Sequence, residues 1–109
     1  MNNVKDLIKS GKTVVGTGGS VVEADIAMLA DSGLDFILFD TQHSPIEVKE
    51  YNRAIQAMSG KSAAPLVRVS ANRADLICFA LDIGARGIVV PMVNTKEEAA
   101  AMVRACKYS

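Results

Sequence analysis

Three polar residues that can do chemistry stand beside apolar stretches of the chain: Asp40, His43 and Arg68. His43 is the only histidine and lies in FDTQHSPIE, three residues after Asp40. Imidazole changes its protonation near pH ~6.5, so a histidine beside a carboxylate at a strand end can exchange a proton with a substrate at neutral pH. The plainer alternative is a hydrogen-bonded loop histidine that shapes the start of the next helix.

Arg68 lies inside LVRVS, where the alternation of a strand puts it on the face opposite to Val67 and Val69. An unpaired buried charge is costly, so its guanidinium needs an anionic partner. That partner is either a carboxylate of the chain, Asp40 or Glu47, or the carboxylate of a ligand. The pattern leaves these two interpretations open.

Asp82 is unusual because it lies in FALDIG, in the last turn of an expected helix. A negative charge there opposes the helix dipole at a cost of about 0.3–1 kcal/mol. Another interaction should therefore hold it, either a structural hydrogen bond to the following loop or a contact that orients His43 and raises its basicity.

Two other groups of residues carry weaker signals. Gly16-Thr-Gly-Gly-Ser20 joins a strand to a helix, but Val21 stands where a phosphate-binding GxGxxG loop needs glycine, so we expect a flexible loop at the rim of the sheet. Cys78 and Cys106 lack a CxxC neighbour or a second histidine, so we expect core thiols in a reducing compartment.

The chain alternates short apolar segments with amphipathic helices. We expect strands at 13–17, 35–39, 66–70 and 87–91, all rich in β-branched residues. Helix starts are expected at capping signals, and helix ends at glycine. The expected starts are Asn3, Ser20 with Glu23, Ser44 with Glu47, Asn72 with Asp75, and Thr95 with Glu98, and the expected ends are Gly11, Gly33 and Gly84.

This order, a short helix followed by four strand-helix units, predicts a parallel sheet covered by helices in a single domain, 1–109. Two architectures are compatible with it: an open doubly wound sheet, which the length favours, or half of a (β/α)8 barrel. In both, ligands bind at the carboxyl ends of the strands, where Asp40 and His43 lie. Motifs must decide between them.

Composition narrows the class of protein. Half of the 109 residues are hydrophobic and the formal net charge is zero, which argues against disorder and against a nucleic-acid surface. Apolar runs fall short of the ~20 residues that cross a membrane, and no signal peptide is recognisable. We expect a cytoplasmic globular protein.

Several stretches together resemble the HpcH/HpaI aldolases, class II pyruvate-dependent aldolases with a (β/α)8 barrel. They are GKTVVGT, SGLDFILFDTQHSP, PLVRVSAN and LDIGARGIVVPMVNTKEEAAAMVRACKYS, which cover most of the chain. The resemblance implies an α/β fold, the N-terminal half of a TIM barrel.

The resemblance also implies roles for single residues. His43 matches the acid/base histidine, Arg68 the arginine that holds the pyruvate oxygens and stabilises the enolate, and Asp82 the aspartate that increases the histidine's basicity. Asp40 matches an aspartate near the metal's water shell. Gln42 departs from the family, which usually has glutamate there, so a negative charge beside the histidine is lost.

The implied reaction cleaves 4-hydroxy-2-oxo acids to pyruvate and an aldehyde, with a divalent metal (Mg²⁺, Mn²⁺ or Co²⁺) polarising the ketone. The family's metal-ligating glutamate and aspartate come from the second half of the barrel, and no residue of this chain matches them. Catalysis is therefore expected to need that half. A half barrel leaves two sheet edges open, so we expect a homo-oligomer or pairing with a second half barrel. The alternatives are a non-catalytic module that assembles or binds 2-oxo acids, and a regulatory open α/β domain.

Overall fold

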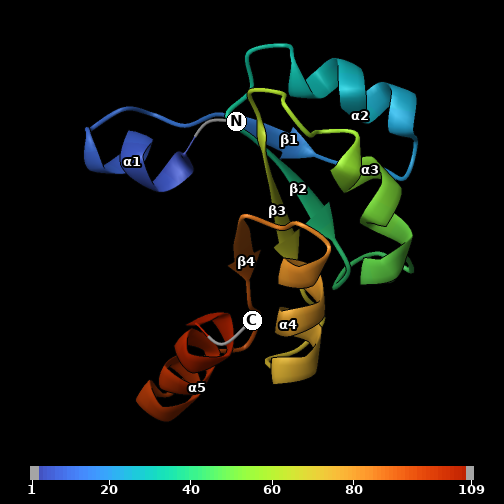
Figure 1. Ribbon diagram of the computed structural model, residues 1–109. Coiled ribbons are helices and arrows are strands. Elements are labelled where there is room, and N and C mark those ends of the chain that lie inside the picture. Colours follow the sequence, from blue (N-terminus) through green and yellow to red (C-terminus); the bar gives the residue numbers. More distant parts are fainter. Residues whose placement is uncertain (1–2, 108–109) are drawn as a thin grey trace.

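The computed structural model describes residues 3–107 (Figure 1). Tyr108 and Ser109, the last residues of the stretches that carry the resemblance, lie outside the described residues. In chain order the elements are α1 (Val4–Lys9), β1 (Gly16–Gly18), α2 (Glu23–Ala30), β2 (Phe36–Asp40), the 3₁₀-helix η1 (Val48–Tyr51), α3 (Asn52–Gln56), β3 (Ala64–Arg68), α4 (Ala74–Asp82), β4 (Gly87–Val89) and α5 (Lys96–Lys107).

The four strands form one parallel sheet in the order β1-β2-β3-β4. Helices α2, α3 and α4 lie on the same side of this sheet in Figure 1. A doubly wound sheet reverses its strand order and places helices on both faces, whereas a (β/α)8 barrel adds each strand beside the last with its helices outside. The observed order therefore selects the barrel, and the prediction of an α/β half barrel is confirmed.

The main core lies between the sheet and its helices. The strand residues Ile37, Phe39 and Val67 are fully buried there, as is Val69 directly after β3. They pack with helix residues that include Ile26, Ala30, Tyr51, Ile55, Ile77 and Ala80. This alternation is the one expected from LVRVS, and it leaves Arg68 on the other face of β3.

The opposite face of the sheet, which would be the inside of a barrel, is only half-buried. Phe36, Leu38 and Leu66 alternate there with the core-facing residues. Gly16 and Gly87 make room on this face, since a Cβ would lie 2.3 Å from the Phe36 ring in the first case and 2.6 Å from Leu66 in the second. This face therefore presents apolar side chains that the described residues do not fully cover.

All four strands differ from their predicted bounds. Strand β2 begins and ends one residue later than expected, β3 begins and ends two residues earlier, and β4 ends at Val89 instead of residue 91. The first strand differs in more than its bounds. It was expected at 13–17, but the ladder begins at Gly16 and runs through Gly18, so the expected flexible rim loop is wrong. The Gly19 amide continues the ladder by donating to the carbonyl of Leu38 at 2.8 Å. A Cβ at Gly19 would lie 2.6 Å from the Phe39 ring. The glycines thus serve close packing of β1 against β2.

Three predicted helix starts were wrong. Ser20 and Ser44 each accept a hydrogen bond two residues ahead, from the amides of Val22 and Ile46, both at 3.2 Å. These local turns compete with capping, so the helical segments begin later. Helix α2 begins at Glu23, and η1 begins at Val48 with a capping box formed by Glu47 and Glu50 instead.

The third wrong start is Asn72, whose side-chain amide donates to the carbonyl of Glu98 instead of capping α4. Two starts are confirmed: Asn3 accepts from the Asp6 amide, and Thr95 from the Glu98 amide. The glycine helix ends are also confirmed, because Gly11, Gly33 and Gly84 all have positive φ.

The two cysteines differ in their surroundings. Cys78 in α4 is half-buried and its sulfur lies 3.8 Å from the carbonyl oxygen of Ala105 in α5, whereas Cys106 is exposed. The prediction of a core thiol was therefore wrong for Cys106, because α5 has no buried residues.

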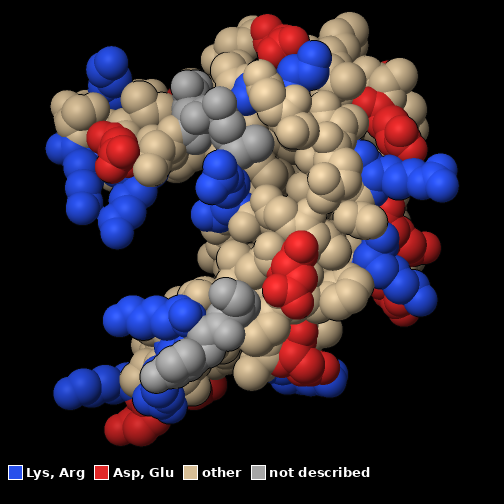
Figure 2. All heavy atoms as spheres, viewed as in Figure 1, with Lys and Arg blue, Asp and Glu red and all other residues tan. Residues whose placement is uncertain are grey.

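The surface view in Figure 2 shows basic and acidic side chains spread over the visible face, with both signs also present over α1 and α5. Both signs are thus present, as the formal net charge of zero requires. Within residues 3–107, no helix is long and apolar enough to cross a membrane.

Candidate active site at the ends of β2 and β3

Asp40 and Arg68 end two neighbouring strands and face each other directly. They are register partners in the β2-β3 pair, so both side chains leave the sheet on the same face. Arg68 donates from Nε to Asp40 Oδ1 at 2.9 Å and from Nη2 to Oδ2 at 2.6 Å. The side chain of Arg68 is 30% exposed and that of Asp40 is 24% exposed, so this bidentate pair is partly shielded but still reaches solvent.

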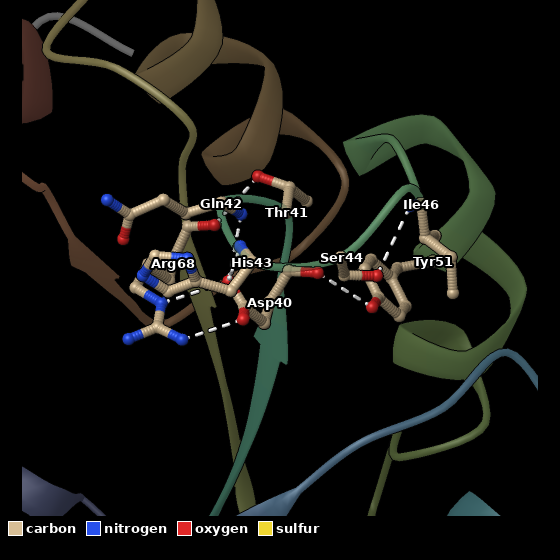
Figure 3. A network of polar contacts seen from close by, with 8 residues as sticks. All are labelled: Asp40, Thr41, Gln42, His43, Ser44, Ile46, Tyr51 and Arg68. Atoms are coloured by element: carbon tan, nitrogen blue, oxygen red, sulfur yellow. Dashed lines mark hydrogen bonds and ion pairs between the residues drawn. The ribbon is translucent and has the colours of Figure 1, made fainter.

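The same carboxylate holds the loop that follows β2 (Figure 3). Asp40 Oδ1 accepts from the backbone amides of Gln42 at 2.8 Å and His43 at 3.3 Å. Asp40 therefore connects the guanidinium of Arg68 to the main chain of His43. This is a geometric link between the histidine suggested for acid-base chemistry and the arginine suggested for binding a carboxylate.

His43 is exposed and lies in a loop, not at a helix start. The loop spans 41–47 between β2 and η1, because the turn at Ser44 delays the helix. Figure 3 shows Asp40, His43 and Arg68 gathered at the ends of the two strands. Gln42 lies beside them and is half-buried. The exposed His43 side chain has access to solvent, and its main-chain amide connects it through Asp40 to the Arg68 guanidinium.

The electrostatics of the pair favour its charged form. The Arg68 guanidinium holds the pKa of the Asp40 carboxyl well below its usual range, and the amides of Gln42 and His43 act in the same direction against the opposing effect of burial. The same interaction raises the pKa of Arg68. Both groups thus remain ionised at any pH at which the chain would work.

Asp82 lies elsewhere. It is exposed, at the end of α4, and the neighbouring Ile83 carbonyl accepts from the side chain of Gln56 at the end of α3. Helix ends in strand-helix units return to the amino ends of the strands, whereas His43 follows the carboxyl end of β2. The structure therefore brings Asp40, His43 and Arg68 together and does not bring Asp82 to them within this chain.

Two neighbours of the site were not singled out from the sequence. Thr41 donates from its hydroxyl to the carbonyl of Arg68 at 2.7 Å, and Tyr51 donates to the carbonyl of Asp40 at 2.8 Å. Both hydroxyls fix main chain next to the ion pair. The position of Thr41 directly after a strand-end aspartate was a usable signal, but nothing in the helix pattern distinguishes Tyr51 from a core aromatic.

A cavity of about 400 Å³ adjoins the loop of His43 on the side of η1 and α4. Its lining includes Thr41, Ser44, Ser70, Leu76 and Phe79. It shares Thr41 and Ser44 with the loop, and neither Asp40 nor Arg68 is among its lining residues.

A divalent metal needs several oxygen or nitrogen ligands in one place. Within the described part of the chain, no group of three or more His, Cys, Asp or Glu is placed to hold one. Asp40, the carboxylate nearest to the site, already uses both oxygens on Arg68. The described residues therefore do not fit a metal site by themselves.

Comparison with known proteins gives consistent matches. A family model described as HpcH/HpaI aldolase/citrate lyase matches residues 20–109. The chain is 36% identical over 109 residues to the hydroxypyruvate/pyruvate aldolase of Roseobacter denitrificans, covering 99% of this chain and 43% of that protein. It is 37% identical over 110 residues to the 4-hydroxy-2-oxo-heptane-1,7-dioate aldolase of Klebsiella pneumoniae subsp. pneumoniae, covering 99% and 42%.

The fold comparison agrees. The crystal structure of an HpcH/HpaI aldolase from Desulfitobacterium hafniense DCB-2 superposes with a TM-score of 0.85 at 29% identity, covering 96% of this chain and 41% of that one. The chain thus spans about two fifths of the length of the relatives it matches.

Proposed function

The chain belongs to the HpcH/HpaI aldolase/citrate lyase family, and we propose that it supplies the first four strand-helix units of a pyruvate aldolase. The reaction is the cleavage of a 4-hydroxy-2-oxo acid to pyruvate and an aldehyde. The activity belongs to a complete eight-stranded barrel. The relatives are more than twice as long as this chain, since it covers 43% and 42% of their lengths.

One observation carries the proposal: a single carboxylate, Asp40, holds both Arg68 and the main chain of His43 at neighbouring strand ends. Two of the five N–H donors of Arg68 are used on Asp40, which leaves donors for a ligand anion. A guanidinium whose orientation is fixed in advance stabilises developing negative charge without reorganising during the reaction. That is the requirement for an enolate oxygen.

In the proposed cleavage, the His43 imidazole takes the proton of the 4-hydroxyl group. The C3–C4 bond breaks, its electron pair forms the enolate of pyruvate, and the aldehyde leaves. Arg68 binds the oxygens of the 2-oxo acid and balances the enolate charge. The imidazolium then delivers this proton to C3, which completes pyruvate and returns the imidazole to its starting state.

Asp82 and Gln42 have supporting roles in the proposal. The resemblance gives Asp82 the role of raising the basicity of the histidine. Asp82 is exposed at the end of α4, away from His43 of the same chain. In that role Asp82 would therefore contact the histidine of another chain. Gln42 offers amide hydrogen bonds to the loop or a ligand in place of a charge.

We propose that the divalent metal of the family is bound by the complete protein, because the described residues do not fit a divalent-metal site by themselves. Mg²⁺, Mn²⁺ or Co²⁺ would need ligands contributed from outside residues 3–107.

The proposal also includes a cytoplasmic location and an assembled state. Among the described residues β1 pairs only with β2 and β4 only with β3, so each has an edge without a strand partner. Such edges and a half-buried inner face are completed by further barrel strands or by a second copy of the chain. The substrate partner is a small 2-oxo acid.

The first test follows exchange of the pyruvate methyl protons with deuterated water by NMR, with and without Mg²⁺ or Mn²⁺. The samples are the 109-residue chain, its His43→Ala variant and a full-length relative as positive control. Metal-dependent exchange that disappears in His43→Ala supports a working enolisation site. A folded chain that shows no exchange would be, by itself, only a 2-oxo-acid-binding or assembly module. The observation that favours this alternative is that no group of three or more metal-ligating side chains lies together among residues 3–107.

Measurement of pyruvate binding distinguishes a chain that binds 2-oxo acids at this site from a chain that does not. Pyruvate is titrated into the chain and into Arg68→Gln, with Arg73→Gln as the matched control. Arg73 makes a similar bidentate contact with Asp75, but both side chains are 63% exposed and lie on the outside of the fold. Binding lost only in Arg68→Gln supports the proposed site, and equal binding by all three proteins contradicts it.

A further inference from the structure

Tyr51 is a buried tyrosine placed directly behind the strand-end cluster. It is 2% exposed, and its ring lies 5.0 Å from that of Phe39, tilted by 58°. Its hydroxyl points away from this packing and donates to the carbonyl oxygen of Asp40 at 2.8 Å. The close view in Figure 3 shows this bond on the opposite side of Asp40 from Arg68.

The hydrogen bond is made at the residue where the chain leaves the sheet. Asp40 is the last residue of β2. The backbone amide of the next residue, Thr41, still donates to the backbone carbonyl of Arg68 at 3.0 Å. The Asp40 carbonyl is therefore held by η1 on one side while its carboxylate holds Arg68 and the loop on the other. Rotation of this residue would move both functional partners at once.

We propose that Tyr51 is a positioning residue, whose hydroxyl fixes Asp40 so that one carboxylate can hold the Arg68 guanidinium and the His43 loop together. The functional meaning of this role rests on the proposed 2-oxo-acid site, but the positioning itself does not. Tyr51 acts through Asp40 and has no contact with reacting atoms in this proposal.

The chemistry of the hydroxyl suits a permanent donor. Burial raises the pKa of Tyr51, with the neighbouring Ser44 hydroxyl acting in the opposite direction and the charges of Asp40 and Glu50 adding to the rise. The phenol thus keeps its proton at neutral and mildly alkaline pH. A phenylalanine at this position would keep the ring packing against Phe39 and lose only the bond to Asp40.

The test compares Tyr51→Phe with Ser62→Ala in the 109-residue chain. Ser62 is a matched control because its hydroxyl also donates to a buried helix carbonyl, that of Ala30 at 3.0 Å, at the other end of the sheet. The readouts are backbone hydrogen exchange at Gln42 and His43 and the NMR signal of the Arg68 Nε proton. These three N–H groups all donate to Asp40.

In Tyr51→Phe we expect exchange at these three groups to accelerate about fivefold to tenfold, the size expected when one hydrogen bond is lost. Ser62→Ala should leave them unchanged. Unchanged exchange in Tyr51→Phe, or the same acceleration in both variants, overturns the proposal. In the wild-type chain a slowly exchanging Tyr51 hydroxyl proton is a second expected result, and its absence counts against the proposal even if the variant does not fold.

Pyruvate binding keeps the two proposals separate. Weaker binding in Tyr51→Phe, together with the local change in exchange, supports positioning for function. A change in exchange in a chain whose wild type binds no pyruvate would count against the proposed 2-oxo-acid site in this chain and leave the positioning role intact.

Discussion

The glycines of GTGGS offer a sharp test of how β1 packs, because two adjacent glycines have opposite surroundings. A Cβ at Gly18 would meet nothing within 4 Å. A Cβ at Gly19 would lie 2.6 and 2.7 Å from ring carbons of Phe39 and 2.9 Å from Ile37. Both of those neighbours are fully buried, so neither can move aside easily.

The expected magnitudes follow from these distances. Gly19→Ala overpacks a closed core, which destabilises by about 1–3 kcal/mol. Gly18 does not have a positive φ, so Gly18→Ala removes freedom from the unfolded chain without strain and should be neutral or stabilising by up to about 1 kcal/mol. The two variants should therefore differ by about 1–4 kcal/mol, or on the order of 10 °C in Tm for a domain of this size.

Urea unfolding followed by circular dichroism measures this difference. With a slope of about 1–3 kcal/mol per M, the midpoints of the two variants should lie on the order of 1 M apart, with equal slopes. Gly16→Ala is an informative third variant, since its Cβ meets the half-buried Phe36 ring, which has more room to turn. Equal midpoints for Gly18→Ala and Gly19→Ala would refute the packing explanation and return GTGGS to a mobile loop.

Three further predictions use other parts of the molecule. Phe39→Ala should destabilise by about 3–5 kcal/mol in the same assay, because Phe39 is fully buried between β2 and its helices; a loss below about 1 kcal/mol would be incompatible with that burial. The Arg68 guanidinium lowers the pKa of Asp40 below its ordinary 3.8, so the stabilisation by this ion pair is present above pH 3.8 and is lost as the pH falls below that value. In Asp40→Asn the free energy of unfolding should therefore fall less steeply with decreasing pH in this range. An unchanged pH dependence would contradict a stabilising ion pair. Partial desolvation of the Cys106 sulfur, with Cys78 adding to it, raises the pKa of this thiol above 9.0, although the side chain is exposed. The rate of alkylation by iodoacetamide, followed by mass spectrometry, should therefore reach half of its maximum above pH 9.0, and a half-maximum at or below pH 9.0 would contradict this.

The parts of the fold that follow from periodicity were predictable from the sequence. Strand-helix alternation, the face of Arg68 and the glycine helix ends depend on local pattern, and the structure has them as expected. Arg68 and Asp40 were expected to be able to pair, and the register of β2 and β3 makes them direct partners. The choice between open sheet and barrel needed the family motifs, because strand order is a long-range property.

The three wrongly predicted helix starts have a common physical cause. Ser20, Ser44 and Asn72 are all good capping residues, but each has a competing hydrogen bond that a linear pattern does not reveal. The bounds of the first strand were predicted wrongly for a different reason. Glycines are poor strand formers, but they suit a strand where a neighbouring ring needs the space of a side chain. Tyr51 was missed because its ring satisfies a core position while its hydroxyl serves the strand end.

The Asp40–Arg68 pair also has a consequence for the speed of ligand capture. Because the guanidinium is already neutralised by a bidentate carboxylate, the strand ends present a dipole to solvent instead of a net positive charge. Long-range attraction of anions, which accelerates association at low ionic strength, is correspondingly weak. The association rate of a 2-oxo acid at this site should therefore change little with salt, and discrimination among anions should arise after contact, in how well each one fits the remaining donors of Arg68.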